Sequence, residues 1–178
     1  SWSSDVRSDR LIWTDATCEL FGIRPEEFGG TFDHFRSFIL PEDLPVFDAA
    51  YARVSPAEPL MEMEYRIRRP DGGVRWLYAR GNVEYDAAGA PVSRAGMVMD
   101  ITEQKEAQAQ LAYLHRVRAV LSGINGLIAR EDSREDLFRE ACQIAYSAGA
   151  FRMVMLCIVD PVTQAIVPVA SEGKDEPL

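Results

Sequence analysis

The side chains of this sequence that could do chemistry are few and scattered. Its three cysteines, Cys18, Cys142 and Cys157, stand too far apart for a disulfide framework or a thiolate metal site. Cys142 and Cys157 fall within apolar patterns, and we interpret Cys18 in the same way. We therefore expect all three to be plain core residues. This cysteine usage fits a reducing, cytoplasmic environment.

The two histidines are the next candidates. His34 stands among Phe32, Phe35 and Phe38 at helical spacing, so its ring could point inward, although a packed or surface histidine is the simpler interpretation. His115 falls in a long charged helical pattern, where a solvated face is the default; its protonation near pH 6 is the alternative, as a means of tuning helix pairing. The sequence contains no Ser/His/Asp set, no glycine-rich phosphate loop and no metal cluster, so we expect no enzyme site.

Charged residues alternate along two neighbouring predicted strands, as Glu64, Arg66, Arg68 and Arg75. Cross-strand pairs on a solvated face explain them simply, each contributing about 0.2–1 kcal/mol. The functional alternative is that one arginine pairs with Asp100 and ties the sheet to the helix that follows.

The elements that must position these residues are five strands, with a helical cluster inserted after the second. Short strands are predicted at 1–5 and 10–14, and helical turns follow between residues 16 and 51. Period-two alternation then predicts a half-buried strand at 61–68. Turn signals at 70–73 and 86–89 separate it from strands at 74–83 and 91–101. In the last strand, Met97 and Met99 fall on one side and Val98 on the other.

The last strand ends at Asp100-Ile101-Thr102, and a long helix is predicted from there, with Thr102 as its N-cap. One apolar stripe runs along it at spacings of 4, 3, 3, 4, 3 and 4, through Ala107, Leu111, Leu114, Val117, Leu121, Ile124 and Ile128. This is close to a heptad seam with one stammer, which locally overwinds a coiled coil. Gly123 and Gly126 are expected to weaken the helix.

After this helix the sequence predicts a break at Glu131-Asp132-Ser133, where Ser133 and Asp136 resemble a capping box. A further helix ends at Gly149 and a buried strand spans 151–159. A last strand at 165–170 contains Pro168, which restricts it to a sheet edge. These elements do not complete a core, and both ends of the sequence look like cuts in a longer protein.

The composition is that of an ordinary globular chain, with 47% hydrophobic and 26% charged residues among 178. A formal net charge of −9 argues against sequence-independent nucleic-acid binding. No apolar run approaches the roughly 18–20 residues that span a bilayer, and no signal peptide is visible. A cytoplasmic location is expected, with an upstream membrane anchor left open.

The order of elements, closing on Asp-Ile-Thr, resembles the PAS fold with its PAC motif. The resemblance covers about residues 1–102. Its most specific residues are 64–72 (Glu-Tyr-Arg-Ile-Arg-Arg-Pro-Asp-Gly), Arg75-Trp76-Leu77, 86–89 and 96–102, while 10–22 and Leu40-Pro41-Glu42-Asp43 fit its earlier part. It implies an α+β fold, a five-stranded antiparallel sheet with helices on one face.

Residues 124–171 are similar to the start of a GAF domain, on the strength of 135–142 and 149–153. The predicted organisation is a PAS/PAC domain at 1–102, a connector helix at 103–122 and an incomplete, α/β GAF-like segment at 123–178.

The PAS resemblance implies a small ligand between sheet and helices. The residues expected to line its pocket are Trp13, Phe21, Phe35, Phe38, Ile39, Tyr65, Ile67, Trp76, Tyr78, Met97 and Met99. The same set also describes a filled core, which is the favoured interpretation because bulky aromatic and flexible methionine side chains fill gaps well, so no cofactor is expected. Haem, for which His34 would be the axial ligand, is not expected. Flavin is not expected either, because the neighbours of Cys18 do not form the Asn-Cys-Arg motif of flavin photosensors. Any ligand should be small and mostly apolar.

The resemblance further implies a sensory relay that acts through a homodimer of the connector helix. Asp100, Ile101 and Thr102 would transmit changes in the sheet to downstream GAF and output domains of the same chain, such as a diguanylate cyclase, a cyclic-di-nucleotide phosphodiesterase or a histidine kinase. The alternative is a ligand-free interaction module that only sets the geometry of the dimer.

Overall fold

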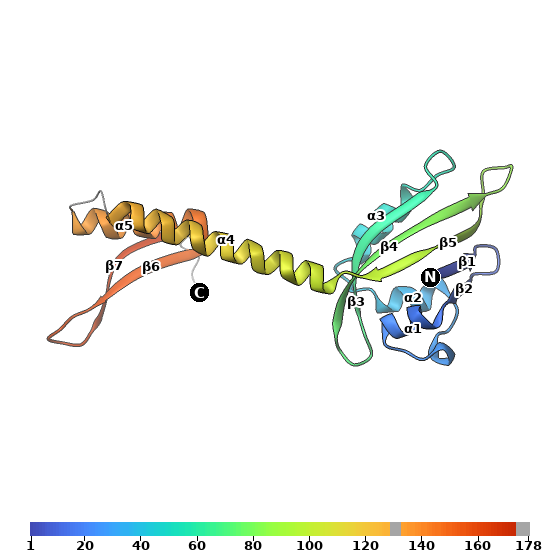
Figure 1. Cartoon of the computed structure of the whole chain (residues 1–178), viewed down its shortest axis with the longest axis horizontal. Coiled ribbons are helices and arrows are strands. Elements are labelled where there is room, and N and C mark those ends of the chain that lie inside the picture. Colours follow the sequence, from blue (N-terminus) through green and yellow to red (C-terminus); the bar gives the residue numbers. More distant parts are fainter. Residues whose placement is uncertain (129–132, 174–178) are drawn as a thin grey trace. The chain divides into compact units, whose positions relative to one another are not determined.

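The computed structural model describes residues 1–128 and 133–173 of the chain (Figure 1). The chain divides into two compact units, Ser1–Glu106 and Ala107–Leu178. The predicted break at Glu131-Asp132 and the end of the predicted GAF-like segment lie outside the described residues.

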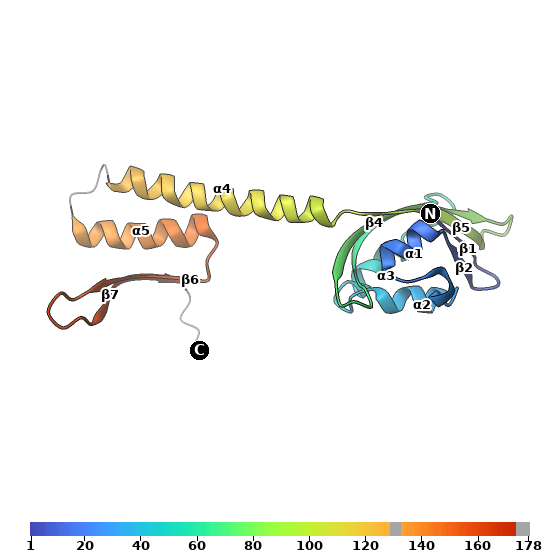
Figure 2. The same cartoon turned by 60° about the horizontal axis from the view of Figure 1, so that its bottom comes forward.

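The first unit is built from five strands, three helices and one 3₁₀ turn. In chain order these are β1 (Trp2–Asp5), β2 (Arg10–Trp13), α1 (Asp15–Phe21), η1 (Pro25–Glu27), α2 (Phe32–Phe38), α3 (Leu44–Ala52), β3 (Leu60–Arg68), β4 (Val74–Tyr85) and β5 (Pro91–Asp100). The sheet order is β2-β1-β5-β4-β3 with every pair antiparallel. Helices α1, α2 and α3 cover one face of this sheet (Figure 2). The predicted fold class is confirmed for this unit.

Alternation along β3 determines which side of the sheet forms the core. Met61, Met63, Tyr65 and Ile67 are buried, and the charged residues between them face outward. The helices contribute aromatic side chains to the same core, in which the Phe47 and Tyr65 rings meet edge to face at 5.4 Å.

The predicted orientation of β4 and β5 was wrong. Leu77 and Ala79 of β4 are buried, whereas Met97 and Met99 of β5 are each 44% exposed and Val98 packs against the core. Both strands carry apolar side chains on each face, so hydrophobicity alone does not reveal which face is inside.

A close approach of backbone to side chain determines this orientation. Gly81 and Gly96 lie opposite each other in β4 and β5, and the Trp2 ring covers both. A Cβ atom on Gly96 would stand 2.8 Å from Cζ2 of Trp2, closer than carbon atoms approach. These two glycines therefore let the Trp2 ring pack directly against the backbone on the inner face of the sheet.

The second unit holds most of α4 (Thr102–Ile128), then α5 (Arg134–Gly149), β6 (Met153–Val159) and β7 (Ile166–Gly173). The two strands pair antiparallel, and the Ser133 hydroxyl accepts the Asp136 N–H at 3.3 Å as the N-cap of α5. Helix α4 continues through Gly123, so the predicted line between connector and GAF-like segment falls inside one helix. A Cβ on Gly123 would lie 2.6 Å from Cγ2 of Ile144, so this glycine lets α4 approach α5 closely.

The cysteines divide between core and surface. Cys18 and Cys142 are each 2% exposed, as predicted. Cys157 was expected in the core but is exposed, because it lies on the face of β6 that no described element covers. None of the described helices combines the length and apolarity needed to cross a membrane.

Candidate functional site: the core cavity and the start of helix α4

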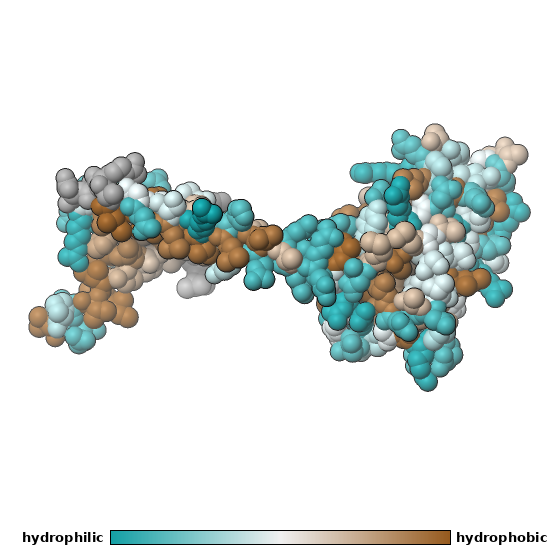
Figure 3. All heavy atoms as spheres, viewed as in Figure 1, coloured by the Kyte–Doolittle hydropathy of each residue, from teal (hydrophilic) through white to brown (hydrophobic). Residues whose placement is uncertain are grey.

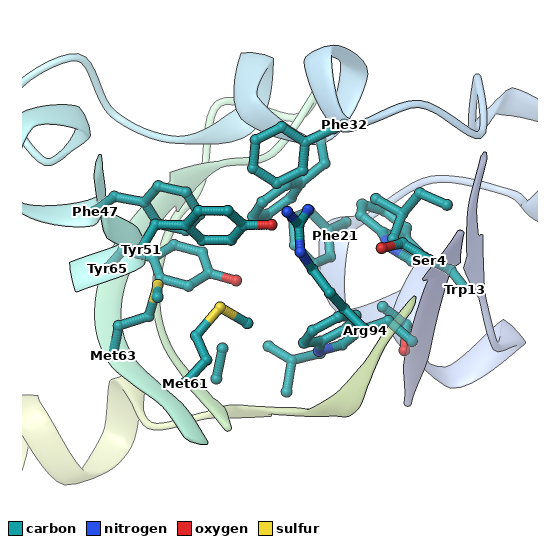
Figure 4. A pocket seen from close by; sticks show the side chains of 16 residues that line it. Ser4, Trp13, Phe21, Phe32, Phe47, Tyr51, Met61, Met63, Tyr65 and Arg94 are labelled. Atoms are coloured by element: carbon teal, nitrogen blue, oxygen red, sulfur yellow. The ribbon is translucent and has the colours of Figure 1, made fainter. Parts of the chain in front are cut away.

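A cavity of about 40 Å³ lies between the sheet and the helices of the first unit (Figure 4). Its walls are mainly aromatic and aliphatic. The lining residues are Trp2, Ser4, Leu11, Trp13, Thr17, Phe21, Phe32, Phe35, Phe47, Tyr51, Met61, Met63, Tyr65, Ala79, Arg94 and Val98.

The expected pocket residues fall into three groups. Trp13, Phe21, Phe35 and Tyr65 line the cavity. Phe38, Ile39 and Ile67 are buried in the same core but lie outside the lining. Trp76, Tyr78, Met97 and Met99 lie on the opposite face of the sheet, because β4 and β5 present Leu77, Ala79 and Val98 inward instead.

The predicted pocket residues did not include Arg94, which is the one charged residue among the lining residues. It alternates with Gly96 and Val98 along β5, so the inward position of Val98 also brings Arg94 inward. Its guanidinium carbon lies 4.7 Å from the ring centroid of Tyr51. The period-two alternation along β5 would have placed Arg94 in the pocket if Val98, and not Met97 and Met99, had been assigned to the inner face.

Two tyrosines supply the other polar groups of the cavity wall. Figure 4 shows the hydroxyls of Tyr51 and Tyr65 directed toward the side on which the Arg94 guanidinium lies. Tyr65 is only 3% exposed, and burial raises its pKa far above the ordinary value. Burial also raises the pKa of Tyr51, so both phenols are neutral hydrogen-bond donors near pH 7.

The second part of the site is the junction where β5 becomes α4. The helix begins at Thr102, two residues after β5 ends at Asp100. The backbone of Trp76 in β4 bonds to both residues of the junction: Ile101 N–H donates to the Trp76 carbonyl at 2.9 Å, and Trp76 N–H donates to Thr102 Oγ1 at 2.9 Å. The sheet and the first turn of α4 therefore share hydrogen bonds.

Thr102 was expected to cap the helix, but it is the first helical residue and its hydroxyl serves the sheet. The Asp100 carboxylate accepts the Thr102 N–H at 2.9 Å and satisfies that donor instead. Asp100 also pairs with Arg75, whose Nε lies 3.8 Å from Oδ2. This is the predicted arginine–Asp100 pair, although both side chains are more than a third exposed and its contribution is small.

Side chains on the outer face extend this junction to the start of α3. The Asp43 carboxylate accepts both the backbone N–H of Arg66, at 2.8 Å, and its Nε, at 2.9 Å. The Arg66 guanidinium lies 5.3 Å from the Trp76 ring, and Lys105 Nζ lies 5.2 Å from that ring. Lys105 also pairs with Glu64 at 2.5 Å. Asp43, Arg66, Trp76 and Lys105 form a continuous series of contacts, here called the outer-face series.

Replacing Asp43 with asparagine is expected to reduce the free energy of unfolding at pH 7 by about 1–2 kcal/mol, because a charge-assisted bond is lost. The Arg66 guanidinium holds the pKa of Asp43 below its ordinary value. A carboxyl whose pKa is lowered by folding stabilises the fold above its unfolded pKa, and this contribution disappears as the pH falls through the lowered folded pKa.

The difference between wild type and Asp43→Asn should therefore be full at pH 7 and shrink below about pH 4. Urea denaturation followed by tryptophan fluorescence at several pH values measures it. The control is Glu42→Gln, which removes the neighbouring charge without removing a bond to Arg66. A difference independent of pH would contradict the assigned role of Asp43.

The histidines take no part in either site. His34 is half-buried, its Nδ1 accepts the Gly29 N–H at 2.6 Å, and it is not among the residues that line the cavity. His115 is exposed on α4. Within residues 1–128 and 133–173, no group of three or more His, Cys, Asp or Glu side chains is arranged to hold a metal ion.

The predicted seam of α4 divides between two faces of the helix. Ala107, Leu111, Leu114, Leu121 and Ile128 are exposed, and Figure 3 shows a run of hydrophobic residues along this helix. Val117 and Ile124 are half-buried, and they lie on the side of α4 that carries the buried Leu127.

Together, the sheet order, the helices on one face and the cavity between them define a small α+β domain with a central pocket. A family profile described as PAS fold matches residues 10–98, which are half of the chain. The chain belongs to the PAS family.

Two curated proteins are similar to this chain. The sensor protein FixL of Bradyrhizobium diazoefficiens is 27% identical over 111 residues, which cover 62% of this chain and 22% of FixL. The uncharacterized protein y4lL of Sinorhizobium fredii is 28% identical over 123 residues, covering 66% of this chain and 14% of that protein. The chain thus spans less than a quarter of the length of these relatives.

Among solved structures, a sensory box histidine kinase/response regulator from Burkholderia thailandensis matches with a TM-score of 0.52 and 23% identity. The match covers 62% of this chain and 82% of that one. At this identity the likeness supports the fold alone.

Proposed function

We propose that this chain is the sensory module of a larger signal-transduction protein, and that its PAS domain passes a change in the cavity to helix α4. The observation that carries the proposal is the pair of hydrogen bonds between Trp76 and the Ile101-Thr102 junction. Because the first turn of α4 bonds directly to the sheet, a shift of β4 alters how that turn is held.

A physical route connects the cavity to this junction. Phe47 and Tyr51 of α3 line the cavity, and Asp43 immediately precedes α3. Asp43 holds Arg66, which lies on the ring of Trp76. A ligand biases such a route only by binding one arrangement of these side chains more tightly than another.

Dimerisation through α4 is the second component of the proposal. The exposed residues of the seam follow a heptad pattern if Arg118 and Asn125 occupy the two positions between them that are otherwise missing. These exposed residues are Ala107, Leu111, Leu114, Leu121 and Ile128. The spacing is then 4, 3, 4, 3, 4 and 3, with no stammer. An asparagine or a basic residue at a core position of a coiled coil favours a defined register. The seam thus excludes Val117 and Ile124.

The downstream partners follow from the resemblances. The PAC motif and the GAF-like segment support a position within an array of signalling domains. FixL is named a sensor protein and the Burkholderia protein a histidine kinase/response regulator. We infer that the output domain of this protein is of a comparable signalling class, a histidine kinase or a cyclic-di-nucleotide enzyme, in the cytoplasm.

A ligand-free module that only sets the geometry of the dimer is the second candidate. The small cavity favours it, because a core with only about 40 Å³ of free space is nearly filled. In that case the outer-face series would only stabilise the domain, and breaking its Asp43–Arg66 contact would leave the first turn of α4 unchanged.

Hydrogen exchange distinguishes the two candidates. Thr102→Val leaves the Trp76 N–H without its acceptor, so exchange of the bonded amides at the start of α4, those of residue 102 and Lys105, should accelerate about tenfold or more. A relay predicts that the distant Asp43→Asn also accelerates exchange of the Thr102 and Lys105 amides, and that the two effects are not additive in the double variant.

The control is Glu42→Gln, because within the described residues the Glu42 side chain forms no hydrogen bond or ion pair with the junction. This variant should leave exchange at these amides unchanged. Acceleration by Thr102→Val alone, with none from Asp43→Asn, would support the module that only sets dimer geometry.

A further inference from the structure

The cavity contains an arrangement of polar groups that a filled hydrophobic core does not require. Arg94 is half-buried, and none of the carboxylates in residues 1–128 and 133–173 forms an ion pair with it. The Arg94 guanidinium instead makes a cation–π contact with the face of the Tyr51 ring. A guanidinium is charged at every physiological pH, and it is costly to hold such a group at an apolar wall without an anion.

Unpaired phenols accompany this cation. Tyr65 is 3% exposed, and neither its hydroxyl nor that of Tyr51 forms a hydrogen bond with the described residues. No fully buried side-chain polar atom in the described residues lacks a partner, so these hydroxyls are accessible rather than sealed in the core. Each neutral phenol has a proton to donate. Figure 4 shows both hydroxyls pointing across the cavity toward the side of the guanidinium, so three sets of donors converge on one space.

We propose that this cavity binds a short-chain monocarboxylate, with the carboxylate at Arg94 and the hydroxyls of Tyr51 and Tyr65, and the hydrocarbon end against Phe47, Met61 and Met63. The planar guanidinium matches the two oxygens of a carboxylate, which it binds with two parallel hydrogen bonds. The apolar walls contain no second cation for a dicarboxylate.

The size of the cavity limits the ligand. One water needs about 10–15 Å³ of such space, so about 40 Å³ accommodates roughly three or four waters, or an acid the size of acetate or propionate. A ligand with so few atoms reaches at best about micromolar affinity. The inference deepens the proposed function, because it names the ligand class of the same pocket.

The test uses the whole chain and sodium propionate as the probe, at constant ionic strength and pH 7. Trp2 and Trp13 line the cavity, so their fluorescence reports occupancy, and the thermal midpoint provides an independent readout. Propionamide is the matched neutral probe, with the same shape and no charge. We expect saturable binding of propionate, with binding of propionamide weaker by about tenfold or more.

The variants assign the site. Arg94→Gln should weaken propionate binding about 10- to 100-fold, because a charge-assisted pair is lost, and Tyr65→Phe should weaken it about 3- to 10-fold. Arg80→Gln, on the exposed outer face of β4, is the control and should bind as the wild type does. Tyr65→Phe keeps the ring, so it remains informative if Arg94→Gln unfolds.

The proposal would be overturned if propionate showed no saturable binding, or if propionate and propionamide bound with equal affinity. It would also be overturned if the Tyr65→Phe variant and the Arg94→Gln variant both bound propionate as the wild type does. These outcomes are separate from failure of the relay. Ligand binding is measured without reference to α4, whereas the exchange experiment with Asp43→Asn and Thr102→Val uses no ligand.

Discussion

Replacing Gly96 with valine is expected to destabilise the PAS domain by about 3 kcal/mol, in the upper part of the range for overpacked cores. A Cβ at this position would lie 2.3 Å from the Arg80 carbonyl oxygen and 2.7 Å from the Gly81 Cα. Both neighbours belong to the backbone of β4, which pairs with β5 through the centre of the sheet. They cannot move aside without loss of ladder hydrogen bonds.

Urea denaturation measures this loss as a shift of the midpoint with little change in its slope. The matched control is Ala95→Val, one residue earlier in β5 on the exposed face, where the effect should stay within about 0.5 kcal/mol. Equal losses of stability from the two substitutions would show that the close backbone contacts at Gly96 do not exclude a side chain there. Gly96→Val should also displace Trp2 from the wall of the cavity and alter its fluorescence.

The second large effect concerns assembly. If α4 forms the proposed parallel dimer, glutamates in place of Leu114 and Leu121 should convert the dimer to a monomer. Each substitution removes a leucine from the seam and introduces a charge into an apolar layer. The expected cost of about 3 kcal/mol per layer raises the dissociation constant more than about 100-fold for each.

Size-exclusion chromatography with light scattering gives the mass, and circular dichroism checks that helix content is retained. Ala112→Glu with Ala119→Glu is the matched control, because these residues have the same seven-residue spacing and are exposed away from the seam. The control should remain dimeric. A wild-type chain that is monomeric at micromolar concentration would refute the dimer itself.

Local sequence patterns were sufficient to predict most elements of the chain. Alternation through Met61, Met63, Tyr65 and Ile67 identified β3 and its buried face, because every residue between them is charged. The junction at Asp100-Ile101-Thr102 was also predicted, since the period-two pattern ends where the helical pattern starts. Such signals depend on neighbours in the chain, so the sequence contains them in full.

Side-chain roles at the junction were less predictable. Thr102 has the residue type of an N-cap, and nothing nearby in the sequence indicates that its hydroxyl accepts the N–H of Trp76. That bond joins residues 26 positions apart, and only the pairing of β4 with β5 brings them together. The same holds for Asp43 and Arg66, which are 23 positions apart.

By itself, then, the sequence determined the order of the elements, the fold class and the point at which the sheet passes into a helix. Only the tertiary structure decided which faces of β4 and β5 form the core. Apolar residues occupy both faces of these strands, and the deciding interaction is the contact of Trp2 with Gly81 and Gly96 across three strands. That contact places Val98 and Arg94 inside, and so a core that the composition describes as apolar has a cation at its cavity.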